Sequence, residues 1–384
     1  TSIFLQFANT TGAQNVEAIA GMSFQSSNTQ FGNTTGQEFA SDSYRKVTSA
    51  ASITAGSSTE TEFAFLSYFA RANYKFNNKY LISLSGRVDG SSRFGPDRKY
   101  GFFPAASAGW IITEESFLAD NAILDFLKLP GSYGLTGNAE IGNFPWQGLA
   151  SGDGGYAGIS GQRPSQIENR DLRWEQTAQT DIGIDFGFFN SRISGGIDYY
   201  IKKTSDLLLD VNLPRHTGVA ATQTRIVGNL ENKGVEFVLN TENLVGDFKW
   251  STNFNIANNK NKITNLDGQV IEGSFLSRAI EGEPIGIFFG PKYAGVDPAN
   301  GDALYYMEDT NGELVTTNDY NAATFMKIGD PNPKIIFGIT NTFSYKGIDL
   351  SVLFMGVQGN DVYNGGGKFM SANGDFFDNQ TRDQ

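Results

Sequence analysis

The feature that most constrains the fold is a period-two alternation of apolar and polar residues, which comes in pairs of segments joined by very short turns. Even-numbered positions from Ala64 to Phe76 are all apolar or aromatic, whereas the odd positions hold most of the polar residues. The alternation starts again at Tyr80, just after Asn77-Asn78. Side chains alternate across a β-strand, so each segment has one apolar and one polar face, and the tight turn predicts a hairpin.

The connections between successive strands alternate between short and long. Short turns are expected at four places, and long connections rich in Gly, Asn, Asp and Ser separate them. The strands are near the roughly 9–11 residues that a tilted strand needs to cross a bilayer, and outer-membrane barrels combine short periplasmic turns with long extracellular loops. The pattern therefore predicts an all-β, antiparallel transmembrane β-barrel with roughly a dozen strands in this chain. The short turns are 77–79, 190–192, 243–247 and 346–347, and the long loops are about 26–60, 137–171, 205–225 and 258–333.

Composition excludes several classes of function. The 384 residues contain no Cys and one His, and they carry a formal net charge of −12. Thiolate metal sites are impossible, and the single His216 argues against His triads and multi-His metal sites. The negative charge disfavours nucleic acid, and no apolar run is long enough for a transmembrane helix. We therefore predict no enzymatic activity, no cofactor, no metal site and no nucleic-acid partner.

The two faces of the predicted strands have different surroundings. In a membrane barrel the polar face lines a hydrated lumen and the apolar face, which includes Leu84 and Ile184, contacts lipid. Aromatic residues gather near the short turns, as in the aromatic girdles that mark a membrane interface. The residues expected on the lumen face are Arg71, Lys75, Arg87, Asp181, Asp185 and Glu236.

Four residues of the loop 137–171 are the candidates for lining a substrate path: Trp146, Asp153, Tyr156 and Arg163. Sugar rings can stack on the flat faces of aromatic side chains, and charged groups beside them can hydrogen-bond the ligand. The alternative is that the loop folds onto itself and that these residues serve only its own packing. An acidic stretch, 297–302, is expected to be a solvated turn because it lacks the spacing of a calcium loop.

An ordered series of short motifs resembles the SusC/RagA family, the TonB-dependent outer-membrane transporters of Bacteroidetes. The series begins with the most extensive match, residues 87–96, and covers most of the chain from about residue 61 on. The motifs are 87–96 (RVDGSSRFGP), 100–105 (YGFFPA), 107–110 (SAGW), 132–138 (SYGLTGN), 172–175 (LRWE), 198–200 (DYY), 229–236 (NLENKGVE), 282–286 (GEPIG), 328–334 (IGDPNPK) and 356–364 (GVQGNDVYN).

The resemblance implies a location, an activity and partners. It implies a 22-stranded barrel in the cell outer membrane, surrounded by outer-membrane lipid and filled in the whole protein by an N-terminal plug. It also implies import of oligosaccharides or peptides, energised by the TonB complex and assisted by a SusD-like surface lipoprotein. We expect residues 1–384 to be an internal portion of one barrel domain, with the plug and the last strands outside this sequence.

Two other functions and one local departure remain open at this point. A TonB-dependent siderophore receptor would share the architecture, and a secreted soluble β-rich adhesin or carbohydrate-binding protein would share the strand pattern. The departure is Pro130, which stands where the SusC/RagA family has a basic residue. Proline lacks the N–H that a strand donates to its neighbour, so we expect a β-bulge at this position.

Overall fold

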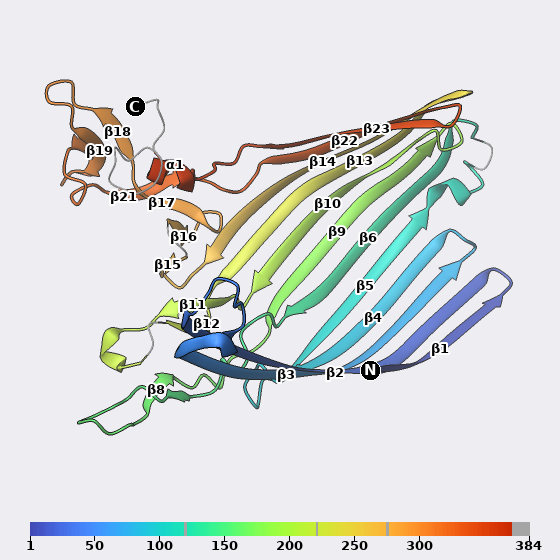
Figure 1. The fold of residues 1–384 in the computed structure, drawn as a ribbon. Coiled ribbons are helices and arrows are strands. Elements are labelled where there is room, and N and C mark those ends of the chain that lie inside the picture. The colour runs from blue at the N-terminus through green and yellow to red at the C-terminus, as the bar shows by residue number, and fades with distance from the viewer. Residues whose placement is uncertain (119–120, 220–221, 274–275, 371–384) are drawn as a thin grey trace. The chain divides into compact units, whose positions relative to one another are not determined.

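The computed structural model describes residues 1–118, 121–219, 222–273 and 276–370, and antiparallel β-strands dominate it (Figure 1). The chain divides into two units, the first made of residues 1–185 and 202–229 and the second of residues 186–201 and 230–384. Three 3-10 turns and one short helix complete the described elements: Val47–Ser49, Ile112–Glu114, Arg215–Thr217 and α1 (Gly365–Met370). No helix in these ranges has the length and apolar character needed to cross a membrane.

The long strands of the first unit follow one another in sequence order, β1-β2-β3-β4-β5-β6-β9. Those of the second unit also run in sequence order, β10-β13-β14-β22-β23. Within the described residues they number seven and five, in line with the dozen expected. Their bounds are β1 (Ser2–Thr11), β2 (Gln14–Phe39), β3 (Ala50–Phe76), β4 (Tyr80–Ser91), β5 (Tyr100–Ile111), β6 (Leu124–Asn138), β9 (Glu175–Phe188), β10 (Ile193–Ser205), β13 (Asn229–Val245), β14 (Phe248–Asn265), β22 (Ile335–Tyr345) and β23 (Ile348–Gln358).

The predicted hairpin over 64–90 is confirmed. β3 and β4 are paired as far as Phe76↔Tyr80, next to the turn. Asn77 and Asn78 have φ angles of 49° and 56°, a left-handed conformation that asparagine tolerates better than most side chains. The turn residues therefore fix the register, and the register places the apolar side chains of both strands on one face.

The segment 26–60, expected to be a long loop, is instead mostly strand. β2 and β3 stay paired as far as Phe39↔Ala50, with one register shift between Thr35 and Gly36. The side chains here are mainly Thr, Ser, Asn and other polar or small residues, and nearly all are exposed on both faces. The apolar alternation therefore stops although the backbone pairing continues, because a two-stranded ribbon with two wet faces needs no apolar side.

Pro130 lies in a regular strand, so the expected bulge is absent from its pairing with β5. It is opposite Gly109, and the register between β5 and β6 runs without a shift from Ala105↔Gly134 to Ile111↔Lys128. Glycine has no side chain, which leaves room for the pyrrolidine ring on the neighbouring strand.

The long connections contain small sheets of their own. The expected loop 137–171 holds a two-stranded hairpin, 205–225 holds most of another, and 258–333 holds two further antiparallel sheets. The pairs are β7 (Leu149–Ser151) with β8 (Arg163–Gln166) and β11 (Leu208–Asn212) with β12 (Thr222–Ile226). Of the two sheets within 258–333, one contains β15 (Ile271–Glu272), β16 (Ser277–Ala279), β17 (Ile287–Pro291) and β21 (Phe325–Gly329). The other contains β18 (Tyr293–Val296), β19 (Ala303–Glu308) and β20 (Leu314–Thr317).

Aromatic rings contact one another at the short turns, as the sequence predicts. Phe76 stacks between Tyr74 and Tyr80 at centroid distances of 6.5 and 6.4 Å. In the second unit Phe343 lies 5.9 Å from Trp250. Clustering of this kind suits a membrane interface, where amphipathic rings are favoured, and that role stays a prediction.

Candidate functional site

The polar face of the first unit carries hydrogen bonds between side chains of neighbouring strands. Arg71 Nε donates to Asn73 at 3.0 Å and to Ser83 at 3.3 Å. On β6 and β9, Lys128 Nζ binds the Asp185 carboxylate at 3.1 Å, and Ser132 donates to Asp181 at 3.1 Å. Four of the six residues expected on the lumen face, Arg71, Arg87, Asp181 and Asp185, thus take part in cross-strand polar contacts; Lys75 and Glu236 lie on β3 and β13.

A cavity of about 500 Å³ opens on this polar face, where β2, β3 and β4 approach the long-loop side. We call it the rim cavity. Volumes of this size hold ligands in many proteins, typically between apolar walls with a few fixed polar groups. Its lining residues are Ser23, Gln25, Phe63, Phe65, Ser67, Arg87, Asp89, Arg93, Gly137, Asn138, Ala139, Glu140 and Trp174.

Arg93 is held in the rim cavity by several contacts. Its guanidinium lies 4.2 Å from the centroid of the Phe63 ring, a cation–π contact. Its Nε donates to Asn143 Oδ1 at 3.0 Å and its Nη1 to the carbonyl of Ala139 at 2.9 Å. The planar guanidinium is thereby fixed between β3 and the segment that follows β6, without a carboxylate partner among these contacts.

The floor of the rim cavity is a charge pair. Arg87 Nε donates to both oxygens of Asp89, at 2.7 and 2.8 Å. Arg87 Nη2 also donates to the buried Ser67 hydroxyl at 3.0 Å. The pair leaves the floor polar and close to neutral, so it favours hydrogen bonding over attraction of a strongly charged ligand.

An aromatic core shares Trp174 with the lining of the rim cavity. Trp174 is 5% exposed, and its ring lies 5.0 Å from Phe94 and 5.3 Å from Phe103. The indole Nε1 donates to the carbonyl of Lys99 at 2.9 Å, which satisfies its buried N–H. The core joins the motifs at 87–96, 100–105 and 172–175, so these motifs have a packing role whatever else they do.

Trp146 does not lie with the other three candidate substrate-lining residues. It packs against the aromatic core, and its Nε1 donates to the carbonyl of Ser92 at 3.2 Å. The structure thus places Trp146 at the base of the loop 137–171, close to the folded-loop alternative that the sequence left open. A contact between Trp146 and substrate stays a prediction.

Asp153, Tyr156 and Arg163 lie together in the part of this loop that β7 and β8 enclose. Arg163 Nη2 donates to Asp153 at 2.6 Å, and the Ser151 hydroxyl also donates to that carboxylate. These hydrogen bonds lower the pKa of Asp153 to about 2, so the carboxylate is charged at neutral pH. Tyr156 is 86% exposed. The three residues form an accessible polar and aromatic tip, and their contact with substrate is untested.

The rim cavity itself was missed in the sequence, although a signal for part of it was present. The motif 87–96 supplies Arg87, Asp89 and Arg93, and of these three only Arg87 is predicted on the lumen face from the alternation of the strand. The ranges that the structure describes contain no group of three or more His, Asp or Glu side chains arranged to hold a metal ion.

Comparison with known proteins gives consistent results. The sequence matches the family model described as TonB dependent receptor-like, beta-barrel, over residues 2–332. A TonB-dependent receptor of Formosa agariphila is 40% identical over 79% of this chain and 32% of that protein. The TonB-dependent receptor SusC of Bacteroides thetaiotaomicron is 34% identical over 94% of this chain and 38% of SusC. The solved RagAB peptide transporter has a TM-score of 0.83 at 28% identity, over 92% of this chain and 40% of that one.

The chain spans about a third to two fifths of the length of these relatives. The matched family model and the antiparallel sheets confirm the predicted barrel class and the outer-membrane location, and they rule out the secreted soluble alternative. The SusC and RagAB matches also confirm the resemblance drawn from the motif series. The chain therefore belongs to the TonB-dependent receptor β-barrel family, among its SusC- and RagA-like outer-membrane members.

Proposed function

We propose that the whole protein imports oligosaccharides or peptides across the outer membrane, with energy delivered through the TonB complex and with a SusD-like surface lipoprotein as its lid. The observation that carries the proposal is the likeness to the RagAB peptide transporter, at a TM-score of 0.83 over 92% of this chain. The 34% identity with SusC over 94% of the chain adds to it. The barrel wall would provide a hydrated passage, and the long loops would form the substrate vault.

The chemistry of the rim cavity supports a neutral or zwitterionic substrate. Its two guanidinium groups are balanced by the carboxylates of Asp89 and Glu140, and Arg87 is already paired with Asp89. A glycan or a peptide offers hydroxyl or amide groups that both donate and accept hydrogen bonds, which suits such a lining. An anionic ferric siderophore would be favoured by a lining with a net positive charge, so the siderophore alternative has less support here.

The proposal assigns no reaction to this chain. The curated relatives are named as receptors, and the rim cavity holds no nucleophile with an adjacent base among its lining residues. The role proposed for the chain is therefore to bind and pass a substrate unchanged.

Deletion of TonB tests the energy source. In cells that express the full-length protein, uptake of the cognate glycan or peptide should stop when TonB is removed, although the protein still reaches the outer membrane. The substrate can be found by growth on a panel of glycans and peptides, and the lid by the surface lipoprotein that copurifies with the protein. Uptake that continues unchanged without TonB would identify a diffusion porin and overturn the importer proposal.

A bulky substitution in the rim cavity tests its part in uptake. Gln25 is exposed and lines the cavity, so Gln25→Trp should fill part of the space and raise the KM for uptake about tenfold, which corresponds to about 1.4 kcal/mol. Gln37→Trp, also on β2 but outside the cavity lining, is the matched control and should leave the KM unchanged. Equal KM values for the two variants would exclude the cavity from the substrate path without affecting the TonB test.

A further inference from the structure

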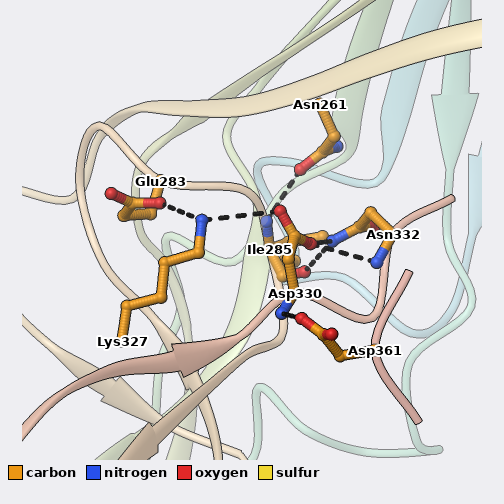
Figure 2. A network of polar contacts seen from close by, with 7 residues as sticks. All are labelled: Asn261, Glu283, Ile285, Lys327, Asp330, Asn332 and Asp361. Atoms are coloured by element: carbon orange, nitrogen blue, oxygen red, sulfur yellow. Dashed lines mark hydrogen bonds and ion pairs between the residues drawn. The ribbon is translucent and has the colours of Figure 1, made fainter. Parts of the chain in front are cut away.

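Four of the motifs shared with the SusC/RagA family meet in one polar network in the second unit. Figure 2 shows this network, in which Ile285 and Asp330 lie at the centre of several hydrogen bonds. The motifs are 229–236, 282–286, 328–334 and 356–364. None of them contributes to the rim cavity, so their meeting needs a separate explanation.

The first part of the network is a clamp on the backbone of Ile285. Asn261 is 8% exposed on β14, and its Oδ1 accepts the Ile285 N–H at 2.7 Å. On the other side, Asn332 Nδ2 donates to the Ile285 carbonyl at 3.1 Å. Asn261 also donates to Asn232 on β13 at 2.7 Å. The turn 282–286 is therefore fixed to two long strands and to the segment before β22.

The second part of the network is an ion pair with two acceptors. Lys327 Nζ, on β21, lies 2.6 Å from Glu283 and 3.4 Å from Asp330 (Figure 2). Asp330 Oδ1 in turn accepts the backbone N–H and the side-chain amide of Asn332, at 3.0 and 2.9 Å. The side chains that close the clamp are thus held by the sheet that contains β21.

The third part of the network connects a different segment, 359–364, which follows β23. The Asp361 N–H donates to the Asp330 carbonyl at 2.7 Å, and the Asp330 N–H donates to Asp361 Oδ2 at 2.8 Å. Gly329 packs against this pair so closely that a Cβ there would lie 3.2 Å from Asp361. Phe288 and Tyr363 form an edge-on ring pair at 6.5 Å. The segment 359–364 is therefore docked on β17 and β21.

Buried apolar side chains lie next to these polar contacts in the sequence. Ile263 in β14, Leu266 just after it and Ile287 at the start of β17 are all 0% exposed. The backbones of Ile263 and Glu283 are also hydrogen-bonded, at 2.9 Å. Exposing buried apolar side chains is costly, so we expect the turn 282–286 to stay attached to the end of β14.

We propose that this network is a rigid joint between the connection that carries 282–286 and 327–332 and the segment 359–364, so that a displacement of either one is transmitted to the other. The reciprocal bonds between Asp330 and Asp361 link the two segments directly. Coupling of this kind is reciprocal, so a substitution that destabilises either segment should also destabilise the other. The joint would allow a partner or substrate that contacts one connection to reposition both.

Hydrogen–deuterium exchange on the full-length protein in lipid nanodiscs tests the coupling. Asp361→Leu removes the acceptor for the Asp330 N–H, and exchange should become about two- to tenfold faster in peptides that cover 281–286 and 327–332, not only 359–364. Asn332→Ala should give the reciprocal result, with faster exchange in 359–364. Exchange that rises only in the segment carrying the substitution would overturn the proposal.

Two further variants separate coupling from general damage. Asp361→Asn keeps an acceptor oxygen and should stay close to wild type, whereas exchange as fast as in Asp361→Leu would contradict a hydrogen-bonded joint. Asn321→Ala lies in the same connection, at an exposed position outside the network, and should change neither segment. All variants are compared after a heat-modifiability gel shows a folded barrel. If Asp361→Leu does not assemble, Asn332→Ala decides the question from the other side.

Discussion

At the scale of single residues, the two faces of each strand require different side chains, apolar on one face and polar on the other. Leu84 and Ile184 are 56% and 43% exposed, although both are large and apolar. Asp185, the next residue along β9 after Ile184, is paired with Lys128 on the polar face. Alternation along the strand explains this contrast, because neighbours in sequence point to opposite sides of the sheet.

A charge on the apolar face should prevent normal assembly. Leu84→Arg or Ile184→Arg should destabilise the folded barrel by roughly 2–4 kcal/mol near the bilayer midplane. Asp185→Asn should be tolerated, since it stays on the hydrated face. Heat-modifiability gels of outer membranes measure the folded fraction of each variant. Equal folded fractions for all three would show that the faces are assigned wrongly.

Gly95 is a second residue with a sharp requirement. Its N–H donates to the carbonyl of Leu172 at 3.3 Å, and a Cβ at this position would lie 2.0 Å from the carbonyl oxygen of Arg170. Gly95→Ala should therefore lower the free energy of unfolding by about 1–3 kcal/mol through forced displacement of the backbone. Gly142→Ala, where a Cβ would meet nothing within 4 Å, is the control. Urea unfolding of the full-length protein should separate the two, and equal midpoints would refute the close approach.

The candidate site shows what single residues can and cannot reveal in a sequence. The types of Asp153 and Arg163 suggested a polar loop, but their ion pair depends on a hairpin that brings together residues ten positions apart. Trp146 is a candidate for lining the substrate path, and its packing against the aromatic core is not evident from its residue type. Which side chains contact one another depends on how the chain folds, so residue type alone does not predict these contacts.

At the scale of elements, the lengths of the turns predict the orientation of the strands in the membrane. The turns 190–192 and 346–347 are short, whereas the connections 137–171 and 258–333 contain additional sheets. Barrels of the outer membrane place their short turns in the periplasm and their long loops outside the cell. Single cysteines can report this orientation, because the chain has no Cys of its own.

Ser151→Cys on whole cells should react with a membrane-impermeant maleimide, and Ser191→Cys should not. Ser151 lies in β7 of a long loop, and Ser191 lies in the short turn between β9 and β10. Labelling after cell lysis controls for reactivity of both thiols. Labelling of Ser191→Cys alone on intact cells would show that the topology is the reverse of the one predicted.

Elements with one apolar face were predictable, and elements stabilised by distant pairing were not. The hairpin at Asn77–Asn78 was evident because alternation and turn residues agree. The ribbon within 26–60 was missed because neither of its faces is apolar. The pairing of Phe288 with Gly329 joins segments far apart in the chain, and no local pattern in a single sequence announces it.

At the scale of the whole molecule, the sheet order leaves two strands with a partner on one side only within the described residues. β1 pairs with β2 and β23 with β22, and each strand ends the order. Lipid cannot satisfy the unpaired backbone groups at a strand edge. Because the relatives are longer than this chain, we expect further strands of the full-length protein to pair with β1 and β23.

Residues 1–384 expressed alone with an export signal should therefore fail to form a heat-modifiable barrel. The full-length protein, expressed from the same promoter, should form one. The expected product of the short version is degraded or aggregated protein in the cell envelope. A stable, heat-modifiable band from residues 1–384 would mean that these strands satisfy their own edges.

The β2–β3 ribbon is longer than a strand needs to be to cross the bilayer. β2 has 26 residues and β3 has 27 (Figure 1). At about 3.3 Å per residue β2 is about 85 Å long, and crossing the bilayer uses about 9–11 residues, which leaves about 50 Å beyond it. If the short turns lie in the periplasm, this length of paired strand extends outside the cell. An epitope tag inserted in its turn, residues 40–49, should then bind antibody on intact cells, and a tag accessible only after lysis would contradict this orientation.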